Sequence, residues 1–122
     1  NIFIFGLETP EVDALNAQGY KPWEYYNNSV KIKETLDFIR TMTVGGMNFN
    51  FIVDYLLTQD NYMCLADFES YVEAQEKVAQ TYQDKEKWGQ MSLVNTANAG
   101  IFSADRSVEE YAKDIWDIKK VK

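Results

Sequence analysis

Carboxylates are the most frequent side chains in this sequence that could do chemistry, and two of them could act as acid and base on a sugar bond. Glu69, Glu73 and Glu76 fall on the polar face of a predicted helix, and Asp84 occupies a predicted cap position. The pair Glu109-Glu110 stands at a predicted helix start, where the helix dipole favours negative charge. We therefore interpret these side chains as solvated or capping groups and not as a catalytic pair.

Aromatic residues near the N-terminus could form a sugar-binding surface. Trp23, Tyr25 and Tyr26 are close in sequence and could stack on sugar rings. Aromatic side chains more often pack in a core or an interface, however, and we favour that role here.

Two further features could bind a phosphate group. Arg106 lies next to Asp105, and a local ion pair or a cap contact is the favoured interpretation. The pair Gly45-Gly46 lacks the spacing of a phosphate-binding loop. We accordingly assign no catalytic, cofactor-binding or metal-binding residue to this sequence.

Histidine is absent from the sequence, which removes Ser-His and Cys-His catalysis and the commonest zinc ligand. Cys64 is the single cysteine, so the chain has no internal disulfide and suits a reducing compartment such as the cytoplasm. Because Cys64 lies in the apolar run of residues 62–66, we expect it to be buried.

The net charge of −7 argues against a nucleic-acid partner, because such binding needs clustered lysine and arginine. The C-terminal lysines Lys119, Lys120 and Lys122 are interpreted as compensating the dipole of a last helical turn. No apolar run reaches the ~18 residues of a membrane helix, so no membrane partner is expected. Asn1 is an unlikely natural start, and no signal peptide is evident.

The hydrophobic pattern predicts a mainly α-helical chain, with about six helices and one N-terminal strand over residues 1–6. Thr9 is predicted to cap a first helix, with Pro10 at its first position and Gly19 at its end. Ser29 is predicted to cap a helix that buries a stripe of three residues, namely Ile32, Leu36 and Ile39. A loop over residues 41–48, a buried helix over 49–57 and a short extended segment over 62–66 follow.

The second half of the chain carries stronger helix signals. Asp67 is predicted to cap a helix with apolar positions near 68, 71, 72, 78, 79 and 82. Asp84 is predicted to cap the next helix, which Gly100 closes. Ser107 and Glu110 fit a capping box and predict a final helix over about 107–118.

The predicted strand has no partner nearby in the sequence. A lone strand leaves unpaired backbone groups, so Asn1 to Phe5 should pair with residues 62–66, with a second copy, or with neighbouring parallel strands of an intact protein. We interpret the chain as one that begins in the middle of a domain.

Several segments in series resemble one known family. They are Asp67-Phe-Glu-Ser-Tyr-Val-Glu-Ala-Gln-Glu-Lys-Val78, Asp84-Lys-Glu-Lys-Trp88, Gly100-Ile-Phe-Ser-Ala-Asp-Arg-Ser107, Glu110-Tyr-Ala-Lys-Asp-Ile-Trp116 and the opening Asn1-Ile-Phe-Ile-Phe-Gly6. Together they are similar to the C-terminal end of the α-glucan phosphorylases, the glycogen, starch and maltodextrin phosphorylase family. The loop from Thr41 to Phe49 departs from the family, which commonly has a longer stretch there with a Phe-Phe pair.

The resemblance implies that residues 1–122 are the last part of a Rossmann-like C-terminal domain in a glycosyltransferase-B fold. It also implies an enzyme that cleaves α-1,4-glucan with phosphate and releases α-D-glucose 1-phosphate. The family's pyridoxal phosphate is bound to a lysine that would lie upstream of Asn1, and no residue of this chain matches that motif. The family's final helix runs back toward the N-terminal domain and serves packing and domain coupling.

Two functions follow from these observations. In the first, the chain is a structural, non-catalytic segment of such a phosphorylase, and its partner is the remainder of that chain. In the second, it is an independent helical interaction module without catalysis. In either case, we expect the isolated chain to bind no pyridoxal phosphate and to release no glucose 1-phosphate.

Overall fold

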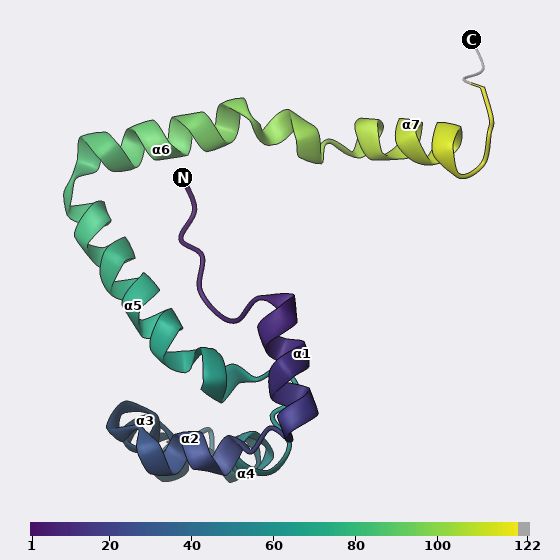
Figure 1. Ribbon diagram of the computed structural model, residues 1–122. Helices are drawn as coiled ribbons and strands as arrows, with labels where there is room; N and C mark the ends of the chain where they lie inside the picture. Colours follow the sequence, from purple (N-terminus) through teal and green to yellow (C-terminus); the bar gives the residue numbers. More distant parts are fainter. Residues whose placement is uncertain (120–122) are drawn as a thin grey trace. The chain divides into compact units, whose positions relative to one another are not determined.

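The computed structural model describes residues 1–119, and these form two compact units that are considered separately here. One unit comprises residues 3–78. The other comprises residues 1–2 together with the chain from residue 79 onward. The described residues are mainly helical, as predicted, and carry a single two-stranded sheet (Figure 1).

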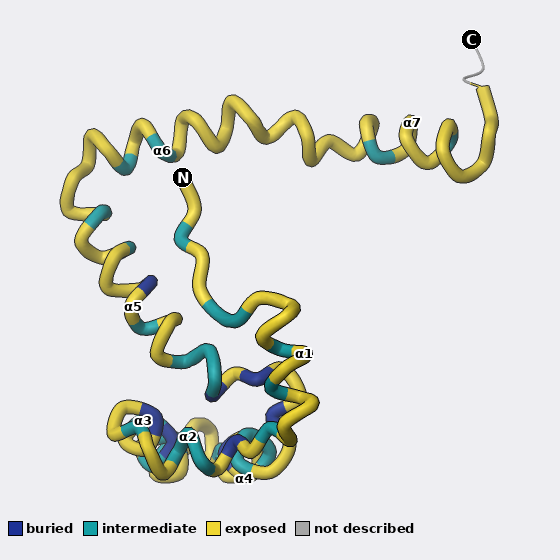
Figure 2. Tube along the Cα trace, in the orientation of Figure 1, coloured by how far each residue is buried: buried dark blue, intermediate teal, exposed yellow. Residues whose placement is uncertain are grey.

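The unit of residues 3–78 is built on three helices that pack side by side (Figure 1). After the first helix, α1 (Thr9–Gln18), these are α2 (Pro22–Asn28), α3 (Val30–Thr41) and α4 (Asn50–Thr58). The long helix α5 (Cys64–Gln83) begins in this unit. Its first turn contributes Leu65 to a core that also contains Ile32, Leu36 and Val53 (Figure 2). Tyr25, Tyr26 and Ile39 pack against this core, so the buried stripe predicted for α3 is confirmed.

Short-range signals explain the element boundaries in this unit. The Ser29 hydroxyl accepts a hydrogen bond from Ile32 N and caps α3, as predicted. Gly19, with φ +83°, ends α1. A two-residue turn at Gly45-Gly46 joins β1 (Thr43–Val44) to β2 (Met47–Asn48), and both glycines have positive φ. The predicted loop is therefore an antiparallel hairpin.

The second unit has no buried residue between positions 79 and 119 (Figure 2). Its helices are α6 (Lys85–Ala97), the short 3₁₀ helix η1 (Ala99–Phe102) and α7 (Ala104–Asp114). The Asp84 carboxylate accepts from Lys87 N at 3.0 Å and caps α6, as predicted. Gly100 lies inside η1, because α6 already ends at Ala97.

The predicted N-terminal strand is wrong for this structure. Residues 1–5 take part in no sheet, and α5 begins at Cys64, so the extended segment over 62–66 is also wrong. The two predicted partners therefore do not pair with each other. A strand is stabilised by hydrogen bonds to a neighbouring strand, and the sequence of one strand does not reveal which segment that neighbour is. Pairing of Asn1 to Phe5 with a second copy stays a prediction.

Three predicted helix starts were placed too late along the chain. Helix α1 begins at Thr9 and has Glu8 at its cap position, with Pro10 at the second helical position. Helix α5 begins at Cys64, because Asp60 accepts from the first backbone N–H groups, and Asp67 therefore lies inside the helix. Helix α7 spans Ala104–Asp114, because the Ser103 hydroxyl accepts from Arg106 N one turn earlier than the predicted Ser107.

Two predictions about single residues also need correction. Cys64 is exposed and not buried, because the apolar side of the first turn of α5 is formed by Leu65. Lys119 lies beyond the end of α7 at Asp114, so it does not belong to a last helical turn, which instead contains Lys113. Lys120 and Lys122 lie outside the described residues.

Candidate functional site

The carboxylates considered as a catalytic pair are exposed and separately engaged. Glu69 accepts a 2.5 Å hydrogen bond from the Ser29 hydroxyl and lies 3.9 Å from Lys31 Nζ. Asp84 caps α6, and Glu73 and Glu76 lie on the exposed face of α5. These groups therefore lie on solvated faces and caps, as predicted. Glu109 and Glu110, by contrast, lie within α7 and not at its start, because the helix already begins at Ala104.

Arg106 makes the local contacts expected of it. Its guanidinium forms an ion pair with Glu110 at 2.5 Å, one turn further along α7. Its Nε donates to the carbonyl of Ile101 at the preceding 3₁₀ helix. The contact with Ile101 ties α7 to η1, and the ion pair with Glu110 lies within α7. Together they occupy the side chain that was a candidate for phosphate binding.

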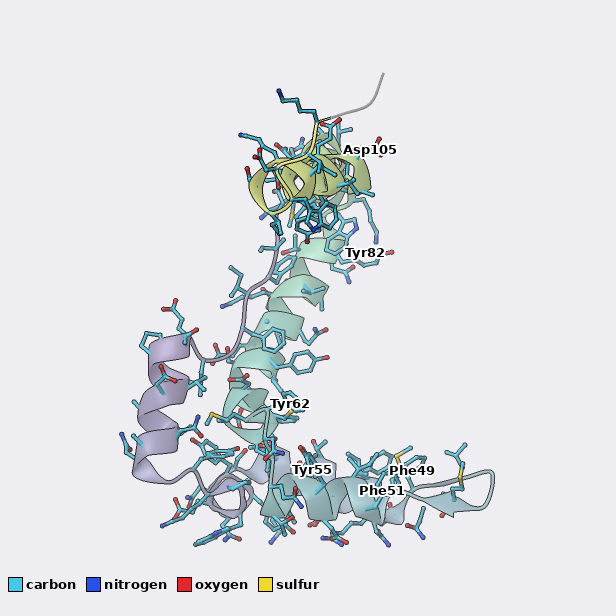
Figure 3. All side chains as sticks on the ribbon, turned by 90° about the vertical axis from the view of Figure 1, so that its right-hand side faces the viewer. Phe49, Phe51, Tyr55, Tyr62, Tyr82 and Asp105 are labelled. Carbon is cyan, nitrogen blue, oxygen red and sulfur yellow. The ribbon has the colours of Figure 1, made fainter. Side chains whose placement is uncertain are left out.

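The aromatic group near the N-terminus divides between core and surface. Tyr25 and Tyr26 are half-buried against the core, and the Tyr26 hydroxyl donates to Asp37 at 2.6 Å. This hydrogen bond, followed by desolvation, raises the pKa of Tyr26. Trp23 is half-exposed on α2, and Tyr62 and Phe51 are more exposed still (Figure 3).

A buried centre that the sequence reading missed is built around Asp60, which is 1% exposed. Its Oδ1 accepts from Cys64 N at 2.9 Å, and its Oδ2 accepts from Leu65 N at 2.9 Å. The Tyr20 hydroxyl donates to the same Oδ2 at 2.6 Å. Burial, then the hydrogen bond and charge of Asp60, raise the pKa of Tyr20. The sequence signal that could have identified this centre is an aspartate placed shortly before the apolar start of a helix, where it can act as a cap.

The geometry of this centre supports a structural role. Asp60 adopts φ +35°, a left-handed conformation that costs energy for a residue other than glycine. Its carboxylate accepts from three donors, and two of these are N–H groups at the start of α5 that no helical carbonyl can reach. The centre therefore fixes where α5 begins.

The Cys64 thiol next to this centre is a poor nucleophile. Partial desolvation by neighbouring atoms, followed by the negative charge of Asp60, raises the pKa of this exposed thiol and keeps it protonated at neutral pH. Since the thiolate is the reactive form, the exposed position of Cys64 does not make it catalytic.

Surface depressions within the described residues include two that are lined partly by apolar groups. One of about 440 Å³ lies where the junction of α2 and α3 meets the start of α5, and it is lined mainly by apolar groups such as Tyr25, Ile32 and Leu65. The other, of about 610 Å³, lies along α7 beside Val108, Ala112 and Ile118. Neither contains a set of convergent polar groups that resembles a catalytic centre. No group of three His, Cys, Asp or Glu residues within positions 1–119 is placed to hold a metal ion.

None of the helices in residues 1–119 combines the length and apolar character needed to cross a bilayer.

Comparison with known proteins gives a consistent result. The family model described as carbohydrate phosphorylase matches residues 1–118. The chain is 46% identical to a glycogen phosphorylase of Synechocystis sp. over 99% of its own length, and 41% identical to that of Bacillus subtilis over 97%. It is 38% identical to the brain form of glycogen phosphorylase from sheep, over 95% of its length. It spans only about 15% of the length of these relatives. On this evidence, the chain belongs to the carbohydrate phosphorylase family.

Proposed function

We propose that this chain is a structural segment from the C-terminal domain of an α-glucan phosphorylase. The whole protein would cleave the terminal glucose of an α-1,4-glucan with inorganic phosphate and release α-D-glucose 1-phosphate in the cytoplasm. The domain that contains this segment would have the Rossmann-like architecture of the glycosyltransferase-B fold. Membership of the family supports this proposal, since the relatives that the chain matches are named glycogen phosphorylases.

The main support for a structural role comes from the described part of the chain after residue 78. This part contains no buried residue, although it is rich in large apolar side chains. Val108 and Tyr111 on α7 are 57% and 52% exposed, and Ile115, the residue that follows the helix, is 68% exposed. Leu93 and Val94 on α6, and Ile101 and Phe102 on η1, are exposed as well. A stretch of this kind has nothing of its own to offset the entropy of ordering its backbone.

The remainder of the phosphorylase chain is the partner that would cover this surface. Val108, Tyr111 and Ile115 recur at helical spacing, so they form one apolar stripe along α7 and its C-cap residue. Burying each such side chain stabilises a protein by about 1.5–3 kcal/mol. The segment would thus couple its own domain to another part of the enzyme, and contact with glucan or phosphate would come only through the complete protein.

The chemistry of the enzyme is assigned to residues outside this chain. Pyridoxal phosphate would be attached to a lysine upstream of Asn1, since no residue of this chain matches the cofactor motif of the family. Its carboxylates serve caps and ion pairs, and its thiol is held protonated. The role left to residues 1–122 is to hold the domain in shape.

Substitution on α7 tests the structural role in the intact protein. Tyr111→Ala removes a side chain from the apolar stripe, and we expect a loss of about 3 kcal/mol, in the range for burying an aromatic residue. Lys113→Ala is the matched control, because the Lys113 side chain is 86% exposed on the same helix. The expected result is a lower thermal midpoint for Tyr111→Ala alone. Equal midpoints for both variants would favour the independent interaction module instead.

A further inference from the structure

Helix α1 is the one helix within residues 3–78 that buries none of its residues. Val12 and Leu15 are only half-buried, and the other side chains of α1 are exposed (Figure 2). The helix has ten residues, which is shorter than the ~12–15 residues at which isolated helices become even marginally stable in water. Neither the burial of its side chains nor the intrinsic helix propensity of its sequence therefore explains why α1 is helical. The explanation lies at its two ends.

Two backbone N–H groups just before α1 donate hydrogen bonds to side chains of α5. Leu7 N donates to Asp67 Oδ1 at 2.8 Å, and Gly6 N donates to the Ser70 hydroxyl at 3.1 Å. Gly6 has φ +89°, and a β-carbon there would lie 2.8 Å from Asp67 Oδ2. Only glycine fits this approach without strain. We call these contacts the Gly6–Asp67 clasp.

The C-terminal end of the segment is fastened at the start of the same helix. The Tyr20 hydroxyl donates to Asp60 Oδ2, and Asp60 in turn holds the first N–H groups of α5. Because Asp60 is buried, the loss of the Tyr20 donor leaves Oδ2 with one hydrogen bond fewer, with Leu65 N still donating to it, in a site with little water. We call this contact the Tyr20–Asp60 clasp.

We infer that residues 6–20, which contain α1, form a strap that one clasp at each end holds against the start of α5. This strap can detach as a unit while the core around α3 and α4 stays folded. The two clasps lie 14 positions apart in the chain, from Gly6 to Tyr20, and their acceptors all lie within residues 60–70. Opening exposes the backbone of α1 and the first turn of α5. This inference concerns only the contacts within residues 3–78 and does not depend on the proposed enzymatic role.

Hydrogen exchange of the intact protein, read peptide by peptide, tests the strap. Tyr20→Phe removes one donor and keeps the ring. We expect at least tenfold faster exchange in α1 and in the first turn of α5, the scale for losing a hydrogen bond to a charged acceptor. Tyr26→Phe is the matched control, since its hydroxyl makes a bond of the same 2.6 Å length to Asp37. Unchanged α1 exchange in Tyr20→Phe, or equal effects of both variants, would overturn the inference.

A measurement on the unaltered protein covers the case in which Tyr20→Phe fails to fold. Native-state exchange at increasing, sub-denaturing urea reports whether a segment opens locally or only with the whole protein. We expect α1 to exchange at least tenfold faster than α3 and through a local opening. If α1 amides exchange only with those of α3 and α4, in one common opening, the strap does not exist.

Discussion

The Tyr20 hydroxyl lies 2.6 Å from Asp60 Oδ2, and this contact joins the segment after α1 to the start of α5. The acceptor is buried, and its other bonds go to Cys64 N and Leu65 N. Asp60 thus joins Tyr20 to the first two residues of α5, Cys64 and Leu65. The consequences for stability, pH dependence and thiol reactivity can each be measured.

Alkaline pH should weaken the fold through Tyr20. Its pKa in the folded protein is raised by burial and by Asp60, so the folded state keeps the phenolic proton longer than the unfolded state does. The contribution is fully present below the unfolded pKa of about 10, and it is lost as pH rises above that value. We expect the free energy of unfolding in urea to fall between about pH 10 and 11. Tyr20→Phe should fall less over the same interval, and an equal fall in both proteins would contradict the assignment.

Removal of the Asp60 carboxylate should destabilise the protein strongly. Asp60→Ala leaves Cys64 N and Leu65 N without an acceptor and places alanine at a positive φ. The expected loss is about 2–4 kcal/mol. Asp54→Ala is the control, because Asp54 forms an exposed ion pair with Arg40 whose loss should cost under about 1 kcal/mol. Urea denaturation checks both, and similar losses would show that Asp60 has no special role.

The Cys64 thiol should react slowly despite its exposure. Its raised pKa leaves little thiolate at neutral pH, so alkylation by iodoacetamide at pH 7 should be slower than that of a free cysteine. Asp60→Asn removes the nearby negative charge and should speed the reaction. Mass spectrometry of the modified chain follows both rates. Reaction of the unaltered protein faster than free cysteine would refute the predicted protection.

The parts of the fold that the sequence predicts are those with local causes. Ser29 and Asp84 cap helices through N–H groups three residues ahead, and Gly19 ends α1 by its own backbone conformation. The core stripe of α3 follows from helical spacing alone. These features need no knowledge of distant residues, and the structure contains them as predicted.

The elements that the sequence predicted wrongly depend on distant residues or on rare backbone conformations. The start of α5 depends on Asp60 acting across a turn in which both Asp60 and Met63 have positive φ, a conformation that sequence patterns rarely reveal. Residues 1–5 look like a strand, but strand formation depends on a partner that the sequence does not identify. For the candidate site, the absence of histidine could be read from the sequence, but the role of Asp60 could not, because burial of a single aspartate is decided by tertiary packing.

The central claim, that this chain contributes structure and not chemistry to a phosphorylase, is tested most directly by assaying the purified 122-residue chain. The chain is incubated with pyridoxal phosphate, and bound cofactor is measured by absorbance after gel filtration. Release of glucose 1-phosphate from an α-1,4-glucan and phosphate is measured in parallel, with a complete glycogen phosphorylase as the positive control. We predict no stoichiometric cofactor and no glucose 1-phosphate from the chain alone. Cofactor bound one to one, together with product release above the no-protein blank, would contradict the account.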